Sequence, residues 1–331
     1  MNERKDILVY IESNPDGSAV DASLGLLSAA SGIAAKRGGR ICALVIGGNC
    51  ADAAASAAKY GAELVIEAEG EEYAVYSTEA YTAALCRAAE EFNAAVILLC
   101  SSLQGQDFGP RAACRLRAGI ASDCTSVNVS EDGRIEWTRP SFSGSIQETV
   151  ACESVPQLAT IRAGAFKKGE AGEAGAEYVK LDKLLGLEDI RTKLLEVIRG
   201  EGEESVDLAG ADILVAGGMG MGGPEGITEL QALADALGGT IAASRAMVDE
   251  GWISSAYMVG QSGKTVAPKI YIACGISGAI QHVSGMRDSG LIIAINKDAD
   301  APIFKVADYG IVGNVHEILP LLTEAVKSLK A

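Results

Sequence analysis

The chain has 331 residues, 48% of them hydrophobic, and 44 acidic against 28 basic side chains give it a net charge of −16. This length and apolar content fit two domains of ordinary size rather than one small core. The acidic balance excludes nucleic acid as an expected partner, because such a surface repels phosphates. No apolar run reaches the roughly 20 residues of a membrane span, and the charged start MNERKD does not resemble a signal peptide. We therefore expect a cytoplasmic protein without a membrane span.

The eight cysteines form no Cys-x-x-Cys pair, and the two histidines, His282 and His316, lie near no pair of cysteines. Structural zinc sites need closely spaced ligands of these types. We expect no metal site, and free thiols buried among apolar neighbours in a reducing compartment.

The first half of the chain alternates short β-rich runs with longer Ala-rich runs of helical spacing. Strands are expected at Ile7–Ile11, Arg40–Ile46, Glu63–Glu67 and Ala95–Leu99, and helices at Ala19–Arg37, Ala51–Tyr60 and Thr78–Phe92. This βαβ rhythm predicts a parallel sheet covered on both faces. The pattern then changes to hairpin-like strands at Cys124–Val129, Arg134–Pro140 and Ser143–Cys152. The first domain is therefore expected to be α/β, with a parallel sheet plus hairpin strands.

Polar tracts separate the two halves of the chain. Ala163–Glu177 is rich in Gly, Ala and Glu and is expected to be a surface loop, and Asp189–Arg199 is expected to be a short helix. Gly200–Ser205 reads GEGEES, a composition typical of flexible linkers. We place the domain boundary there, which gives domains at 1–205 and 206–331.

The second half restarts the α/β rhythm. Strands are expected at Asp212–Ala216, Thr240–Ala243, Lys269–Ala273, Leu291–Ile295 and Tyr309–Val312, and helices at Pro224–Leu237, Ser277–Met286 and Asn314–Leu329. Asn314 can cap the last helix, with Glu317 three residues later in a capping-box pattern. The expected fold is a doubly wound parallel sheet that binds ligands at the carboxyl ends of its strands.

The loop after the first strand of this domain has the spacing of a diphosphate-binding turn. Gly218, Gly220 and Gly223 satisfy G-x-G-x-x-G, which by itself is a weak signal. The next expected strand leads into Ala242-Ala243-Ser244-Arg245, which lacks the acidic residue that holds the ribose of NAD. An Arg there could meet the extra phosphate of NADP, so an NADP-binding oxidoreductase domain remains an alternative. It could equally be a fixed cation that stabilises negative charge on an electron-accepting ring.

Two further Gly-flanked segments place polar groups together. Gln261-Ser262 lies between glycines and offers an amide, a hydroxyl and open backbone. Ser277 opens an expected helix after a strand, where the amides of Gly278 and Ala279 would point at an anion. His282, on the same helix, could donate a hydrogen bond into the site.

The order of these segments resembles the alpha subunit of electron transfer flavoproteins. The residues that carry the resemblance are AASRAMVDEGW (242–252), VGQSGKTVAPKIYIACGISGAIQH (259–282), AINKDADAPIF (294–304) and VADYGIVG (306–313). The N-terminal half resembles the first domain of the family more loosely. The resemblance implies a heterodimer with a beta subunit and one FAD held mainly by the C-terminal domain.

The same resemblance implies the activity. Members carry electrons on FAD between acyl-CoA dehydrogenase-type flavoenzymes and another acceptor, as in fatty acid beta-oxidation, and some bifurcate electrons from NADH with a second FAD in the beta subunit. The chain would thus be an electron-carrying subunit rather than a stand-alone enzyme.

Roles for individual residues also follow from the resemblance. Arg245 would lie against the flavin ring and favour its reduced, anionic form; Ser262 would lie near N5, and His282 would face the carbonyl O2. The other positions implied to bind FAD are Ser244, Val259, Gly260, Gln261, Ser277, Gly278, Ala279, Ile280, Gln281, Asn296, Asn314 and Val315. The chain departs from many members at Met219, where they have Arg, and at Asn314, where they have Asp.

Overall fold

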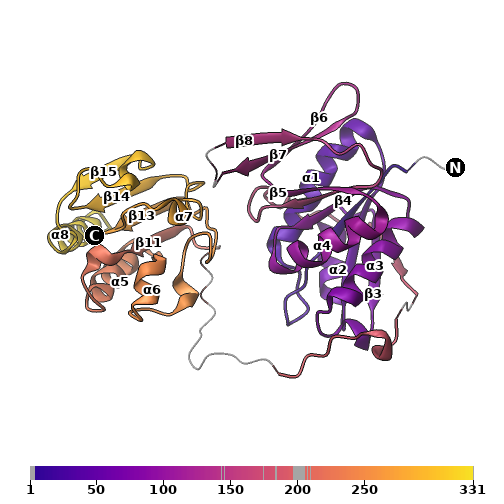
Figure 1. The fold of residues 1–331 in the computed structure, drawn as a ribbon, viewed down its shortest axis with the longest axis horizontal. Helices are drawn as coiled ribbons and strands as arrows, with labels where there is room; N and C mark the ends of the chain where they lie inside the picture. The colour runs from indigo at the N-terminus through magenta and orange to yellow at the C-terminus, as the bar shows by residue number, and fades with distance from the viewer. Residues whose placement is uncertain are drawn as a thin grey trace. The chain divides into compact units, whose positions relative to one another are not determined.

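The structure is a computed structural model that describes residues 4–142, 144, 146–173, 175–182, 185–196, 206, 208 and 210–330. The chain divides into two compact units, Met1–Val197 and Ile198–Ala331 (Figure 1). The run Gly200–Ser205, where we expected the boundary, lies outside the described residues.

The first unit is built on a seven-stranded parallel sheet in the order β10-β3-β2-β1-β4-β9-β5. Its strands are β1 (Asp6–Ile11), β2 (Ile41–Gly47), β3 (Leu64–Glu69), β4 (Ala94–Cys100), β5 (Gly119–Cys124), β9 (Gln157–Ile161) and β10 (Glu177–Lys180). The helices are α1 (Asp21–Arg37), α2 (Ala51–Lys59), α3 (Thr78–Glu91) and α4 (Leu103–Leu116). The chain therefore adds β2 and then β3 on one side of β1, and it continues on the other side of β1 with β4.

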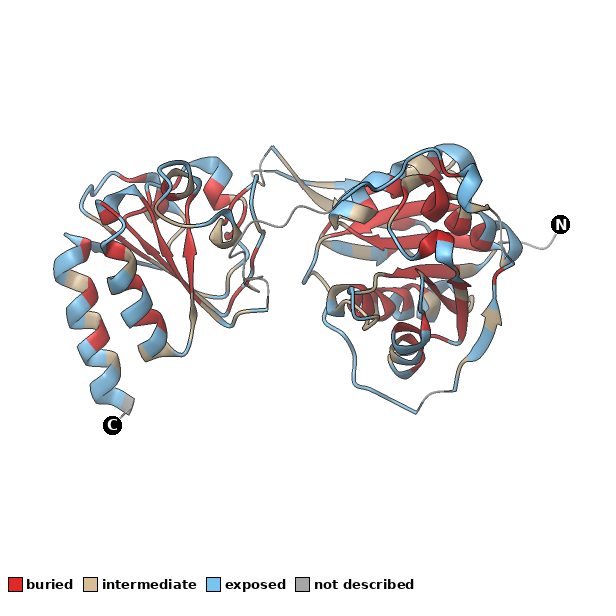
Figure 2. Cartoon of the chain, turned by 90° about the horizontal axis from the view of Figure 1, so that it is seen from below, coloured by how far each residue is buried: buried red, intermediate tan, exposed pale blue. Residues whose placement is uncertain are grey.

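Both faces of this sheet are buried, as the expected βαβ rhythm requires. In β1, Ile7, Val9 and Ile11 pack in one apolar cluster with α1 and α2. Leu8 and Tyr10, which point the other way, pack in a second cluster with α3 and α4. Figure 2 shows the result, with buried residues concentrated in the strands and on the inner sides of the helices.

A three-stranded antiparallel sheet is attached to this unit, as the hairpin-like pattern predicts. It consists of β6 (Ser126–Val129), β7 (Ile135–Ser141) and β8 (Ile146–Val150), in the order β6-β7-β8. Its anchor is Trp137, which is fully buried and donates from Nε1 to Oε1 of Gln157 on β9 at 3.0 Å.

The segment between β9 and β10 crosses the outside of the unit, since these strands lie on opposite sides of the sheet centre. Phe166 packs against the α1–α2 cluster, and the main chain there passes so close to Gly25 of α1 that an added Cβ would lie 2.3 Å from the Phe166 carbonyl oxygen. The Ser28 hydroxyl donates to the Lys167 carbonyl at 2.9 Å, and the Gly172 amide donates to the Lys59 carbonyl, at the end of α2, at 2.8 Å. This expected surface loop is therefore a strap over α1 and α2.

One predicted helix in this unit is wrong. Asp189–Arg199 was expected to be helical, but the described residues form only a 3-10 turn at Leu187–Asp189, and 190–196 have no helix. The reason is a tertiary contact: Glu79 of α3 accepts from the Arg191 amide at 2.8 Å and from its Nε at 2.7 Å. These bonds hold the chain extended.

The second unit is a five-stranded parallel sheet in the order β12-β11-β13-β14-β15. Its elements are β11 (Ile213–Gly217), α5 (Gly226–Leu237), β12 (Thr240–Ala243), α6 (Arg245–Asp249), β13 (Ile270–Cys274), α7 (Ile280–Val283), β14 (Ile292–Asn296), β15 (Tyr309–Val312) and α8 (Val315–Lys330). Every expected strand is present. Leu230 of α5 and Leu319 of α8 belong to the apolar cluster on one face, and Val283 of α7 belongs to the cluster on the other.

The expected helix Ser277–Met286 is shorter than predicted. It begins at Ile280 because Gly278 adopts a φ of +87°, which a helix does not allow, and it ends at Val283. Within the described part of the chain, no helix is long and apolar enough to cross a membrane.

Candidate functional site

The second unit contains a cavity of about 720 Å³ at the carboxyl ends of its central strands. Its lining comes from the loops that follow β11, β12, β13 and β14. The chain order reverses between β11 and β13, and open α/β sheets bind ligands at such a point. The position of the cavity therefore follows from the order of the strands and from the loops at this edge of the sheet.

Glycines bring the loops after β11 and β13 into direct contact. The Gly218 amide donates to the Cys274 carbonyl and the Gly220 amide to the Gly275 carbonyl, both at 2.9 Å. An added Cβ on Gly220 would lie 2.6 Å from Gly275 Cα, a separation that side chains do not tolerate. The absence of side chains here lets the two loops pack backbone against backbone in the cavity wall.

His282 is 6% exposed, lines the cavity, and lies 3.0 Å through Nε2 from the Tyr271 hydroxyl. Tyr271 is fully buried, and a buried phenol needs an acceptor for its proton. We infer that Tyr271 donates to Nε2, which places the imidazole proton on Nδ1. Nδ1 is buried and has no hydrogen-bond partner in the described part of the chain. A residue of the cavity lining therefore carries a donor without an aligned acceptor, since the Val259 backbone interacts with the ring but does not meet hydrogen-bond geometry.

Burial lowers the pKa of His282 from its ordinary value of 6.5 to about 4, against a smaller raising effect of the Val259 carbonyl. The ring is therefore neutral at neutral pH. It can donate one hydrogen bond from Nδ1 but supplies no positive charge.

Arg245 is the first residue of α6, separated from the end of β12 by Ser244 alone. Its side chain is 68% exposed and pairs with Asp249, one turn later, at 3.3 Å between Nε and Oδ2. Exposed pairs of this kind are weak, so the guanidinium can turn toward a ligand. Lys297, after β14, is a second cation on the lining.

The loop 259–264 is fixed to the sheet through its backbone. The Val259 amide donates to the Ala243 carbonyl at 2.9 Å, and the Gln261 amide donates to the Gln281 carbonyl at 2.8 Å. The side chains of Gln261 and Ser262 are exposed at the edge of the cavity. This rigid turn therefore presents the Gln261 side-chain amide and the Ser262 hydroxyl to a ligand in the cavity.

Asn296 joins two of the loops. Its Nδ2 donates to the Ile276 carbonyl at 2.9 Å, and its Oδ1 accepts from the Asp298 amide at 3.0 Å. Both ends of the side chain are therefore used to hold the cavity wall.

The structure brings most of the predicted site residues together around this cavity: Ser244, Arg245, Val259, Gly260, Gln261, Ser262, Ser277, Ala279, Gln281, His282 and Asn296. It places Gly278, Ile280, Asn314 and Val315 outside the lining. Val315 is buried in the apolar cluster under α8. Asn314 caps α8, as predicted, by accepting from the His316 amide at 3.2 Å.

The expected role of Ser277 as a helix cap is wrong. The residue before α7 is Ala279, and Ser277 instead accepts from the Ile303 amide through its carbonyl at 3.0 Å. Ser277 still lines the cavity.

Sequence reasoning assigned no role to part of the lining: Ala246, Asp249, Met258, Gly263, Gly275, Ile276, Lys297, Asp298, Ala301 and Pro302. Gly218 and Gly220, identified by their diphosphate-loop spacing, and Met219 between them also line the cavity. Lys297 follows a predicted strand by two residues, which is a usable signal. Among the described residues, no cluster of three or more His, Cys, Asp or Glu is placed to hold a metal ion.

Comparisons with known proteins agree with this geometry. Residues 7–184 match the family described as electron transfer flavoprotein domain, and residues 207–287 match the electron transfer flavoprotein FAD-binding domain. The second match does not favour the NADP-binding alternative.

Relatives match over nearly their full length. The electron transfer flavoprotein subunit alpha of Thermoanaerobacterium thermosaccharolyticum is 43% identical over all of both chains. Protein FixB of Clostridium saccharobutylicum is 46% identical over 98% of this chain and 97% of its own. The acryloyl-CoA reductase electron transfer subunit beta of Anaerotignum propionicum is 37% identical over all of this chain and 98% of its own.

The residues of the cavity fit FAD. Arg245 and Lys297 bring positive charge to the lining, which suits an anionic cofactor, and the buried Nδ1 of His282 requires an acceptor such as a ring carbonyl. Fold, cavity and both domain matches agree, and the chain belongs to the electron transfer flavoprotein family as an alpha subunit with an FAD-binding C-terminal domain.

Proposed function

We propose that this chain pairs with a beta subunit and carries electrons, on the FAD of its C-terminal unit, between an acyl-CoA dehydrogenase-type flavoenzyme and another acceptor. The observation that supports it most directly is the cavity at the reversal of strand order, with the unpaired Nδ1 of His282 on its wall. The proposed location is the cytoplasm, and the proposed setting is acyl-CoA oxidation or reduction of the kind found in fatty acid beta-oxidation.

The chain's own residues have separate tasks in this proposal. FAD supplies the ring that accepts and releases electrons. His282 donates to that ring's polar edge from Nδ1, while Arg245 supplies the positive charge that a neutral His282 cannot. Both interactions stabilise negative charge at the ring and so raise its reduction potential. Ser262 and Gln261 position the ring from the turn 259–264, and the loops after β11 and β13 form the cavity wall beside the cofactor.

The partner class is supported by one relative in particular. The Anaerotignum propionicum protein is named as the electron transfer subunit of an acryloyl-CoA reductase. An NADH-dependent, electron-bifurcating form of the same role would place a second FAD in the beta subunit. Two FAD per heterodimer would support bifurcation, and one would support a simple carrier.

Flavin content tests the proposal. The complex is purified from cells that express this chain with its neighbouring subunit, and flavin is released by heat and identified by chromatography. We expect a yellow protein that releases FAD, and bleaching on addition of a reduced acyl-CoA dehydrogenase. A colourless protein that takes up no FAD during refolding would contradict the proposal, and binding of NADP⁺ instead would favour the alternative.

A further inference from the structure

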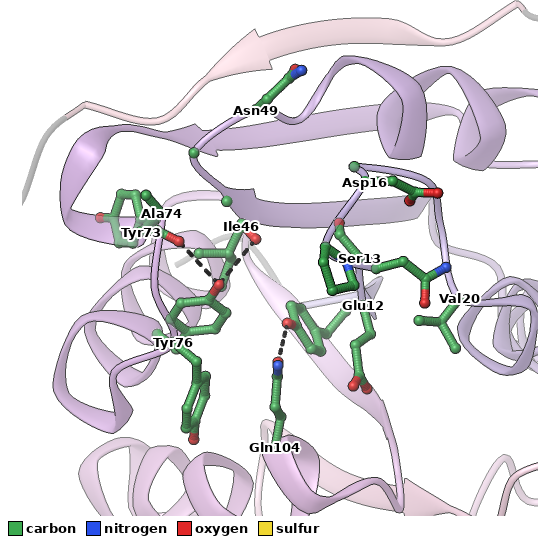
Figure 3. Close-up of a pocket in the computed structure, with 17 residues that line it drawn as sticks. Glu12, Ser13, Asp16, Val20, Ile46, Asn49, Tyr73, Ala74, Tyr76 and Gln104 are labelled. Carbon is green, nitrogen blue, oxygen red and sulfur yellow. Dashed lines mark hydrogen bonds between the residues drawn. The ribbon is translucent and has the colours of Figure 1, made fainter. Parts of the chain in front are cut away.

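The first unit has a cavity of its own, about 570 Å³ in volume, which the proposed function does not use (Figure 3). It lies where β1 and β2 end, with Gln104 of α4 on its wall. Strand order reverses here as well, since β2 lies on one side of β1 and β4 on the other. The volume is within the range of small-molecule sites, and the position is one where open α/β sheets bind ligands.

Tyrosines form one wall of this cavity: Tyr10, Tyr73, Tyr76 and Tyr81. They pack edge to face, with ring centroids 4.9 Å apart for Tyr76 and Tyr81 and 6.4 Å apart for Tyr10 and Tyr81. A wall of interlocked rings is rigid and offers an apolar, electron-rich surface.

Three of the four phenol protons on this wall already have acceptors inside the protein. Tyr10 donates to Oε1 of Gln104 at 3.0 Å, Tyr81 donates to the Tyr73 carbonyl at 3.2 Å, and Tyr76 donates to Oδ2 of Asp107 at 2.5 Å. These three hydroxyls therefore offer only lone pairs to a ligand. A molecule that enters has to donate hydrogen bonds rather than accept them from these groups.

Glu12 follows β1 and brings an unsatisfied acceptor to the same place. Its Oε2 is buried without a hydrogen-bond partner in the described part of the chain, and so is Oγ of the adjacent Ser13. Figure 3 shows the Glu12 carboxyl group and the Gln104 amide on the same side of the cavity. Burial raises the pKa of the Glu12 carboxyl, against a smaller lowering effect of the Ser102 hydroxyl. A cation at this point would offset that burial.

An anionic ligand is disfavoured by two observations. No Lys, Arg or His is among the described residues of the lining, whereas Glu12 and Asp16 are. Two of the amides at the start of α2, where a phosphate would otherwise be attracted, are occupied: Cys50 donates to Oε2 of Glu69 at 3.4 Å and Ala51 to Oδ1 of Asn49 at 3.1 Å.

We propose that this cavity binds a small organic cation, a protonated amine on a flat apolar body. Glu12 pairs with the ammonium group, and the tyrosine wall covers the body through packing and cation–π contact. The site lies in the unit that does not hold FAD, so it stands or fails independently of the proposed electron-carrier function.

Calorimetric titration of the purified full chain, with its accompanying subunit, tests the proposal. Tyramine is the probe, and tyrosol, which has the same ring but a hydroxyl in place of the amine, is the neutral control. We expect saturable binding of tyramine and at least tenfold weaker binding of tyrosol. Comparing tyramine with tyrosol on the wild-type protein tests whether the cavity recognises the positive charge, and this comparison needs no substitution.

Glu12→Gln removes the charge and should weaken tyramine binding at least tenfold while leaving flavin content unchanged. Glu71→Gln is the matched control, because Glu71 is exposed and lies outside the lining. The proposal is overturned if wild-type protein gives no saturable heat with millimolar tyramine, if tyrosol binds equally well, or if Glu12→Gln binds tyramine unchanged. AMP binding in competition with tyramine would overturn it too, since that would show an anion site.

Discussion

At the scale of single residues, the C-terminal site depends on the hydrogen bond between two buried aromatic side chains, those of Tyr271 and His282. Tyr271 has no alternative acceptor in the described structure, so its hydroxyl determines which nitrogen of His282 keeps a hydrogen. A substitution of Tyr271 is therefore expected to change the position of the proton on His282, although Tyr271 itself is not part of the cavity lining.

Tyr271→Phe tests this dependence. We expect the free energy of unfolding to fall by about 1–3 kcal/mol, because Nε2 is left buried without a partner. In the wild type, ¹⁵N chemical shifts should report His282 with the proton on Nδ1, and the variant should lose that preference. His316→Gln assigns the signals, since the chain has only two histidines. Tyr309→Phe, at an exposed tyrosine, is the control. A proton on Nε2 in the wild type would contradict the assignment.

The lowered pKa of His282 predicts a pH dependence of stability. Between about pH 6.5 and pH 4, His282 is protonated in the unfolded chain but stays neutral in the folded chain. The free energy of unfolding therefore falls as the pH falls through this window. The loss approaches about 3 kcal/mol at the lower end. His282→Gln should flatten this slope in denaturant titrations. Equal slopes in wild type and His282→Gln would show that the ring titrates normally.

Arg245→Ala should lower the reduction potential of the flavin, because the positive charge beside the ring is lost. A change of 1.4 kcal/mol corresponds to about 60 mV for one electron. Arg245→Lys should lose part of the effect, since a point charge replaces a planar fork. Arg87→Ala is a matched control, as Arg87 forms the same i,i+4 pair with Glu91 in the other unit. Spectroelectrochemical titration measures all three, and an unchanged potential in Arg245→Ala would refute the role.

At the scale of elements, the contact between the loops after β11 and β13 controls the shape of the cavity. Gly220→Ala places a methyl group against the backbone of Gly275, so one loop has to move. We expect at least tenfold weaker FAD binding, measured by fluorescence titration. Gly32→Ala is the control: Gly32 lies in α1 with open space around it, and Ala there should stabilise the helix by about 0.5–1 kcal/mol. Undiminished FAD affinity in Gly220→Ala would show that the loops adjust freely.

Elements with a strong local pattern could be predicted from the sequence. The strands of the second unit lie within one residue of their expected bounds, because each is a short apolar run between turn residues. The site residues followed largely from the specific resemblance. What failed depends on distant contacts: β10 exists because Glu177–Lys180 pairs with β3, and the predicted helix after Asp189 is absent because Glu79 binds Arg191. The positive φ of Gly278 could not be predicted either, because the helical spacing of apolar residues gives no information about it.

At the scale of the whole molecule, each unit has its own apolar clusters, and no described cluster combines residues from both. We therefore expect two unfolding transitions in calorimetry. FAD should raise the temperature of the transition that belongs to 198–331, because a ligand stabilises only the state that binds it. The first transition should stay in place. A single transition that shifts as a whole on FAD addition would contradict independent unfolding.

The strap between β9 and β10 has a consequence for how the first unit comes into being. On the ribosome, β3 emerges long before β10, and until β10 arrives β3 is an open sheet edge with unpaired backbone groups. Such an edge can pair with other nascent chains. The strap over α1 and α2 connects β9 to β10, so the edge of β3 is closed only by a segment that is synthesised late. Deletion of 162–180 would leave both apolar clusters intact for the most part, yet it would expose the edge permanently and turn a folding intermediate into the end state.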